Sequence, residues 1–216
     1  MIELRNINKT YKTHHVLKDI NLKVHENEII AVEGSSGAGK TTLLKIIGKI
    51  ENPDSGKVIF ENKNITNLNS SELQTFRNKN IGFIFQFHHL MPEFTALENI
   101  CMPGYIKYKD KKIIKEKALE LMSFLKIENQ KNAFPEYMSG GEKQRVAIAR
   151  SLINNPDVIL ADEPSGNLDT IQSMEIYNLF NSLRKQYNQT FIIVTHDKEL
   201  SKLTDKTVFL KDGKII

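Results

Sequence analysis

The sequence contains little cysteine and no apolar run long enough to cross a membrane. Its 216 residues include a single cysteine, Cys101, which fits a reducing compartment and is expected to pack in the core, since no catalytic partner is recognisable nearby. The longest apolar runs, such as residues 158–161 and 191–194, fall far short of the roughly 20 residues that a membrane-spanning helix needs. The first residues also lack the features of a signal peptide. The sequence therefore predicts a protein that stays in the cytoplasm and does not cross a membrane by itself.

An excess of charge of one sign is also nearly absent. The formal net charge is only +4, and the lysines are spread along the chain. The densest cluster, from Lys107 to Lys117, is most simply a solvated helix start and helix face. A nucleic-acid partner is therefore not expected.

The order of apolar segments predicts an α/β protein. A hydrophobic content of 40% can supply a substantial core. Short β-branched runs in the first third suggest some antiparallel sheet, whereas later apolar strands alternate with helical stretches, as in a parallel sheet covered on both faces. The expected strands are residues 2–7, 20–24, 29–33, 57–60, 81–85, 158–161, 191–195 and 207–210.

No repeat, low-complexity tract or linker divides the chain, so residues 1–216 are predicted to form a single domain. Apolar residues between Lys111 and Ile127 fall at helical spacing and predict an amphipathic helix. The segment from about Phe87 to Lys131 is expected to be mainly helical, within an inserted helical subdomain that spans roughly residues 87–155.

A glycine-rich loop lies between a predicted strand and a predicted helix. The loop matches the pattern GxxxxGK[ST], with Lys40 and Thr41 as its last two residues. Glycines let consecutive N–H groups turn toward phosphate oxygens, and the following helix adds its positive N-terminal dipole. Lys40 is the candidate contact to the β- and γ-phosphates, and the Thr41 hydroxyl is a candidate Mg²⁺ ligand. The loop alone leaves kinases, GTPases, helicases and transport ATPases open.

Two adjacent carboxylates follow the apolar strand at residues 158–161. Ligands of open α/β sheets bind at the carboxyl ends of the strands. Asp162 is therefore predicted to contact Mg²⁺, directly or through water, and Glu163 to act as the general base on the attacking water.

Two other polar residues follow comparable strands. Gln86 could contact Mg²⁺ or water, and His196 could hydrogen-bond the γ-phosphate and the attacking water. Either residue alone would carry little weight, but both follow strands that are expected to end in the same crevice. His88 and His89 are not expected to form a metal site, because no cysteine or carboxylate cluster has suitable spacing.

A second glycine pair precedes a helix at Ser139-Gly140-Gly141-Glu142. One subunit hardly needs two phosphate cradles, which suggests that this one addresses the nucleotide of a partner chain. With these motifs the sequence resembles the ATP-binding cassette family, whose signature is LSGGQ or a close relative. Met138 stands in place of the usual Leu and Glu142 in place of the usual Gln.

The resemblance covers essentially the whole chain and implies a P-loop NTPase fold with a parallel core sheet, an antiparallel β-subdomain and an inserted helical subdomain. It implies an ATPase that uses ATP and Mg²⁺ and works as a homodimer, with each ATP held between the Walker A loop of one chain and the signature of the other. It makes Gln86 the Q-loop, Ser165 to Asp169 the D-loop and His196 the switch histidine. The nucleotide-binding residues that it implies are Tyr11, which would stack on adenine, with Gly34, Ser35, Ser36, Gly37, Ala38, Gly39, Lys40, Thr41, Thr42, Ser139, Gly140, Gly141 and Glu142.

Residues 85–100 and the segment ADEPSGNLD at residues 161–169 resemble more narrowly the cassettes that power lipoprotein release from the bacterial inner membrane, with Ser165 where that group usually has Thr. This resemblance implies two integral membrane permease subunits as partners and a peripheral position on the cytoplasmic face of the inner membrane. The apolar segment from Phe87 to Tyr105, predicted to be helical, is the expected dock for a permease helix, although it could simply pack the helical subdomain.

Several alternatives stay open from the sequence. Macrolide-exporter and cell-division cassettes share the NLD segment. A soluble cassette ATPase is less consistent with a chain that has neither a second cassette nor a long insertion. A P-loop kinase is disfavoured by the signature at residues 139–142.

Overall fold

The computed structural model describes residues 1–107, 110–166 and 168–216. A parallel sheet in the order β9-β3-β8-β7-β6 forms the centre, and β10 extends it by pairing antiparallel with β9. A separate antiparallel sheet has the order β2-β1-β4-β5. The strands are β1 Ile2–Tyr11, β2 His14–Val24, β3 Ile29–Glu33, β4 Ser55–Phe60, β5 Lys63–Asn64, β6 Ile81–Ile84, β7 Val158–Asp162, β8 Thr190–Val194, β9 Lys206–Lys211 and β10 Lys214–Ile215.

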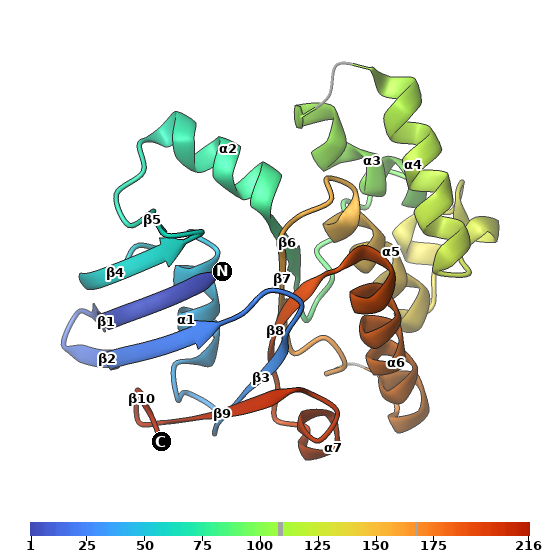
Figure 1. Ribbon diagram of the computed structural model, residues 1–216. Helices are drawn as coiled ribbons and strands as arrows, with labels where there is room; N and C mark the ends of the chain where they lie inside the picture. Colours follow the sequence, from blue (N-terminus) through green and yellow to red (C-terminus); the bar gives the residue numbers. More distant parts are fainter. Residues whose placement is uncertain (108–109, 167) are drawn as a thin grey trace.

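Helices cover the central sheet from both sides (Figure 1). The antiparallel sheet and α1 lie on one side, and α3, α4, α5 and α6 lie on the other. The helices are α1 Lys40–Ile47, α2 Ser70–Asn80, α3 Ala96–Lys107, α4 Lys111–Phe124, α5 Gly140–Leu152, α6 Thr170–Tyr187 and α7 Lys198–Ser201, with short 3-10 helices at Glu128–Gln130 and Pro135–Tyr137. The predicted α/β architecture is confirmed.

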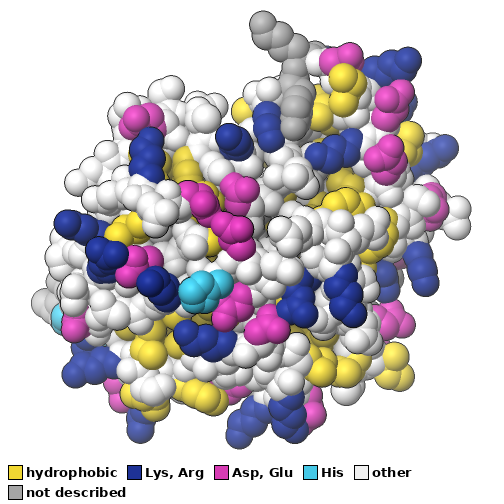
Figure 2. Space-filling model, in the orientation of Figure 1, with side chains coloured by type: hydrophobic (Ala, Val, Ile, Leu, Met, Phe, Trp, Pro, Cys, Tyr) yellow, Lys and Arg dark blue, Asp and Glu magenta, His cyan; other side chains and the backbone are white. Residues whose placement is uncertain are grey.

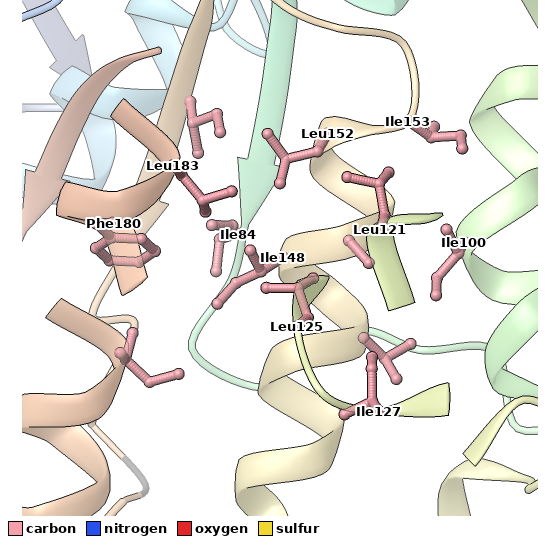
Figure 3. Close-up of a cluster of buried hydrophobic side chains, with 14 of the residues drawn as sticks. Ile84, Ile100, Leu121, Leu125, Ile127, Ile148, Leu152, Ile153, Phe180 and Leu183 are labelled. Atoms are coloured by element: carbon pink, nitrogen blue, oxygen red, sulfur yellow. The ribbon is translucent and has the colours of Figure 1, made fainter. Parts of the chain in front are cut away.

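The alternation of side chains along the central strands divides the core into two parts. In β8, Phe191 and Ile193 face the cluster beneath α3–α6, whereas Ile192 and Val194 face the cluster beneath α1 and the antiparallel sheet. Successive residues of a strand point to opposite faces, so a continuous apolar strand can supply both clusters. Figure 3 shows the first cluster, in which Ile84, Ile148 and Phe180 converge from a strand and two helices. Cys101 belongs to the same cluster and is 1% exposed.

Several local expectations differ from the structure, and β2 begins at His14 rather than at Ile20. Residues 87–95 form turns and irregular backbone, and α3 begins only at Ala96, so the expected helix over 87–105 was wrong in its first half. The helix expected over 111–127 ends at Phe124, because Leu125 caps it and Lys126 adopts a left-handed φ of 57°. Strand β1 extends to Tyr11 rather than to Ile7, since residues 9–11 pair with β2 across a tight hairpin.

Charged side chains are spread over the surface. Figure 2 shows Lys and Arg side chains distributed over the visible face and interleaved with Asp and Glu. Within the described ranges, no helix is long and apolar enough to cross a bilayer.

Candidate active site

The glycine-rich loop connects β3 to α1 and leaves the start of this helix open. Gly39 adopts a φ of 103°, and a Cβ there would lie 2.9 Å from Leu17 Cδ2 and Val16 O, so a side chain is excluded. The first turn of α1 contains no acidic residue, and no side chain caps it. Its N–H groups can therefore receive an anion, with the helix dipole favouring negative charge.

Lys40 lies over the loop that precedes it. Its side chain is largely buried, and Nζ donates hydrogen bonds to Gly34 O at 2.8 Å and Ser35 O at 3.1 Å. These bonds hold the ammonium group at the loop. A phosphate at this position would offer the same ammonium a charged acceptor, which binds more strongly than a neutral carbonyl.

Thr41 and Asp162 join the loop to the end of β7. Thr41 Oγ1 donates to Asp162 Oδ1 at 3.1 Å, although the two residues are 121 positions apart. Burial raises the pKa of Asp162, because an ionised carboxylate is less well solvated there. Both side chains therefore offer oxygen atoms at one point of the site, which is the ligand chemistry that Mg²⁺ prefers.

A cavity of about 320 Å³ brings the two halves of the site together. Gln86, which follows β6, lines the same cavity as Thr41 and Asp162. Its lining residues are Val16, Ser36, Gly37, Gly39, Lys40, Thr41, Thr42, Gln86, Asp162, Glu163 and Val194. Gly34, Ser35 and Ala38 complete the loop without lining this cavity.

Glu163 is held at the edge of the cavity. It adopts a left-handed φ of 47°, and its N–H donates to Val194 O at 2.9 Å. Its Oε2 lies 2.9 Å from His196 Nδ1 and accepts a bond from the His196 N–H at 3.3 Å. The Glu163 side chain is 15% exposed and that of His196 is 72% exposed. The pair can accept a proton from a water molecule in the cavity and pass it to solvent.

Tyr11 lies at the end of β1, outside this cavity. Its ring is 40% exposed, and its hydroxyl donates to the Glu51 carboxylate. The Lys9 ammonium stands 5.4 Å from the ring centroid. An exposed aromatic ring in this position offers a surface on which a planar base can stack.

The second glycine pair begins α5 and does not line the cavity. Ser139 caps the helix, and Glu142 completes a capping box by accepting from the Ser139 N–H at 2.8 Å and the Ser139 hydroxyl at 2.7 Å. Gln130 Nε2 donates to the other Glu142 oxygen at 2.6 Å. The hydrogen bonds from Ser139 lower the pKa of Glu142, so this carboxylate is charged at neutral pH. Gly140 and Gly141 form the first turn.

A family model described as "ABC transporter" matches residues 17–166. The chain belongs to the ABC transporter family. It is 50% identical to the lipoprotein-releasing system ATP-binding protein LolD of Bacteroides thetaiotaomicron, over 100% of this chain and 99% of that protein. It is 48% identical to the LolD protein of Bacteroides fragilis, with both chains fully covered.

Solved structures of cassettes have the same fold. The dimeric structure of MJ0796, a bacterial ABC transporter cassette, aligns with a TM-score of 0.92 at 39% identity and covers 100% of this chain and 96% of that one. A dimeric post-hydrolysis state of the same cassette, bound to ADP and Pi, also aligns with a TM-score of 0.92, at 38% identity and with the same coverage. The predicted cassette fold and the ATPase class are confirmed, and the chain binds and hydrolyses ATP.

Two features of the cassette were not anticipated from its sequence. Arg150 of α5 donates hydrogen bonds to the backbone carbonyls of His88 and His89, just after Gln86. The lone charged residue within the mainly apolar helical run at residues 146–152 was the available signal. The hydroxyl of Tyr177 is hydrogen-bonded to that of Ser165, and burial raises the pKa of Tyr177 to about 12. Of the proposed D-loop, Asn167 lies outside the described residues.

Proposed function

We propose that this cassette is the ATP-hydrolysing subunit of a membrane transporter that releases lipoproteins from the bacterial inner membrane. The observation that supports lipoproteins as the cargo is the 50% identity to LolD over the whole chain. The cassette works as a peripheral protein on the cytoplasmic face of that membrane, and its 216 residues act as one nucleotide-binding domain with a helical part at roughly residues 87–155.

The proposed reaction is the hydrolysis of the terminal phosphate of ATP. A water oxygen bonds to the γ-phosphorus, the bond from this phosphorus to the ADP oxygen breaks, and Glu163 takes the proton of the water. His196 holds the Glu163 carboxylate toward the cavity through the 2.9 Å contact. Lys40 contacts the β- and γ-phosphates. Tyr11 stacks on the adenine ring.

Magnesium fits the oxygen ligands at the end of β7. Thr41 and Asp162 are in hydrogen-bond contact, and Gln86 lines the same cavity. These three residues would hold the ion, directly or through water. When bound, Mg²⁺ neutralises the charge that develops on the phosphate oxygens.

We propose that two copies of the chain share two ATP molecules. The residues Ser139 to Glu142 lie outside the cavity of their own chain, and both MJ0796 structures are dimeric. In the proposed dimer, the signature of one chain meets the γ-phosphate held by the phosphate loop of the other. A two-fold arrangement makes both sites complete at once.

The assignment of Glu163 as the general base is tested with the variant Glu163→Gln. ATP binding should be retained, turnover should fall at least 100-fold, and an ATP-dependent dimer should accumulate, since general bases contribute about 10²–10⁴ in rate. Turnover is measured by phosphate release and the dimer by size-exclusion chromatography with light scattering. Glu199→Gln removes an exposed carboxylate on nearby α7 and should behave as the parent. Parent-like turnover in Glu163→Gln would show that another group is the base.

The proposed permease dock is a groove of about 400 Å³ between α2, β6, α3 and α5. Phe83, Phe85 and Ile106 supply an apolar lining, and Arg77 and Arg150 bring positive charge. Neither arginine has an ion-pair partner among the described residues. An amphipathic permease helix that carries a carboxylate fits this combination. Phe87, which is 69% exposed, lies in the loop beside it.

Arg77→Glu tests the dock. The variant should keep the ATPase activity of the isolated cassette but lose co-purification with its membrane permeases, because a like charge would face the partner carboxylate. Lys112→Glu makes the same charge change on exposed α4 and should leave assembly intact. Parent-like assembly of Arg77→Glu would refute the dock. The cargo is tested separately, with the assembled complex in proteoliposomes. ATP should drive the release of a lipoprotein from the bilayer to a soluble carrier. If the lipoprotein stays in the bilayer while the complex exports another substrate, the cargo is a different one.

A further inference from the structure

Arg150 joins the second half of α5 to the segment that follows Gln86. Its Nη1 donates to His89 O at 2.6 Å, and its Nη2 donates to His88 O at 2.5 Å. The guanidinium group therefore holds two consecutive peptide carbonyls with a fixed fork of donors, which a lysine ammonium cannot reproduce. No carboxylate forms an ion pair with Arg150 in the part of the chain that the structure describes.

The backbone that Arg150 holds is strained. His88 has a φ of 59° and His89 a φ of 47°, so two successive residues with side chains occupy the left-handed region. Such residues persist only where the surroundings hold them. Local support comes from the bonds His88 N–H to Phe85 O at 3.0 Å and His89 N–H to Phe87 O at 2.6 Å. Arg150 adds the only side-chain bonds to these two carbonyls among the described residues.

The two ends of α5 lie at different functional elements. Arg150 holds the segment directly after Gln86, and Gln86 lines the cavity with Thr41 and Asp162. Ser139, eleven residues earlier, caps the other end of the helix. At a rise of about 1.5 Å per residue these points are about 16 Å apart along a rigid rod. A single helix therefore links the Gln86 segment to the signature.

We propose that Arg150 is a positioning residue that couples the two ATP sites of the dimer. Through the carbonyls of His88 and His89, it ties the Gln86 segment of one site to the helix whose start completes the other site. This inference rests on the proposed dimer. ATP bound at one phosphate loop fixes the position of Gln86. The two hydrogen bonds of Arg150 then fix the position of α5 relative to Gln86. As a result, Ser139 contacts the second ATP in the position that supports hydrolysis.

The test compares Arg150→Met, Arg150→Lys and the parent. Arg150→Met removes both hydrogen bonds but keeps an unbranched apolar stem, and Arg150→Lys keeps the charge with one compact donor group. We measure the ATP affinity of the single chain, kcat, the Hill coefficient of turnover against ATP concentration, and the melting temperature. Arg145→Met is the matched control, because Arg145 lies on the same helix but bonds to Glu175 and Leu125 O instead.

For Arg150→Met we expect single-chain ATP affinity within about 2-fold of the parent, kcat reduced about 10-fold, and a Hill coefficient that falls from near 2 toward 1, since two coupled sites set its upper limit. Arg150→Lys should lie between the two.

A purely structural role would lower the melting temperature and the active fraction but leave the Hill coefficient of the folded protein unchanged, and that result overturns the inference. The same holds if Arg145→Met lowers the Hill coefficient equally. If Arg150→Met does not fold, Arg150→Lys supplies the measurement, and a parent-like Hill coefficient there also overturns it. A parent without cooperative ATP dependence overturns both the dimer proposal and this inference, whereas cooperative turnover in the parent and in every variant overturns this inference alone.

Discussion

Helices α1 and α5 both have glycine at their start, before the first turn in α1 and within it in α5, but their first turns differ in charge and in hydrogen bonding. Gly39 precedes α1 without a side-chain cap, and the first residue of the helix is Lys40. Ser139 caps α5, and Glu142 closes the capping box with a charged carboxylate. The start of α1 is therefore open to an anion, whereas the start of α5 already has its own.

This difference bears on how each helix can use its dipole. A carboxylate in the first turn satisfies donors and stabilises the helix, but it also repels a second anion. The α1 start can hold phosphate by itself, together with Lys40. The α5 start fits a γ-phosphate that another chain already holds, which agrees with the proposed dimer.

The largest expected effect comes from removing the cation at the start of α1, which is Lys40. Lys40→Ala should weaken ATP binding about 100-fold, because hydrogen bonds to charged groups contribute about 1.5–3 kcal/mol each and 1.4 kcal/mol is tenfold. The measurement is the Kd for ATP by calorimetry. Lys45→Ala, on the same helix but paired with Glu51 near the surface, should change the Kd little. Equal losses in both variants would show that general charge, rather than the Lys40 contact, sets the affinity.

A pair of glycine substitutions tests whether the glycines at the starts of α1 and α5 are equally required for stability. Gly39→Ala forces a side chain into a left-handed backbone against Leu17 and Val16, and should lower the free energy of unfolding by about 2 kcal/mol or more. At Gly141 a Cβ meets only the end of the Gln172 side chain, with Oε1 at 3.0 Å, and this side chain can move. Gly141→Ala should therefore stay within about 1 kcal/mol of the parent, helped by the helix propensity of alanine. Urea unfolding measures the free energy of unfolding of both variants. Equal destabilisation would show that the two helix starts do not differ in their need for glycine.

The smallest effect is expected from neutralising the Glu142 carboxylate at the start of α5. Glu142→Gln keeps a hydrogen-bonding side chain but removes the negative charge, so ATP-dependent dimerisation should tighten a few-fold at low salt, since a charge at a helix start is worth about 0.3–1 kcal/mol. The dimer constant is measured in the Glu163→Gln background by analytical ultracentrifugation.

The capping box of α2 provides the control for that experiment. Asn69 and Glu72 form the same arrangement at a site away from the nucleotide cavity. Glu72→Gln should cost similar stability and leave dimerisation unchanged. Dimerisation that weakens in Glu142→Gln would mean that its charge assists, rather than opposes, the shared site.

Much of the fold and site could be predicted because their signals are local. The glycine-rich loop, the strand ending in Asp162 and the glycine pair in the first turn of α5 are each contiguous in sequence. The start of α3 was predicted poorly, because the residues after Gln86 are apolar without being helical. Two of their backbone carbonyls accept hydrogen bonds from Arg150, which is more than 60 positions away.

The amino-acid sequence by itself determined which residues could bind phosphate, a metal ion or a proton, because glycine spacing, strand ends and helix starts are properties of neighbouring residues. Only the tertiary structure decided which of them meet. The contact between Thr41 and Asp162, the contact between Glu163 and His196 and the bonds of Arg150 each join different elements. They form because parallel strands bring their carboxyl ends to one edge of the sheet and the buried faces of the helices fix the rest.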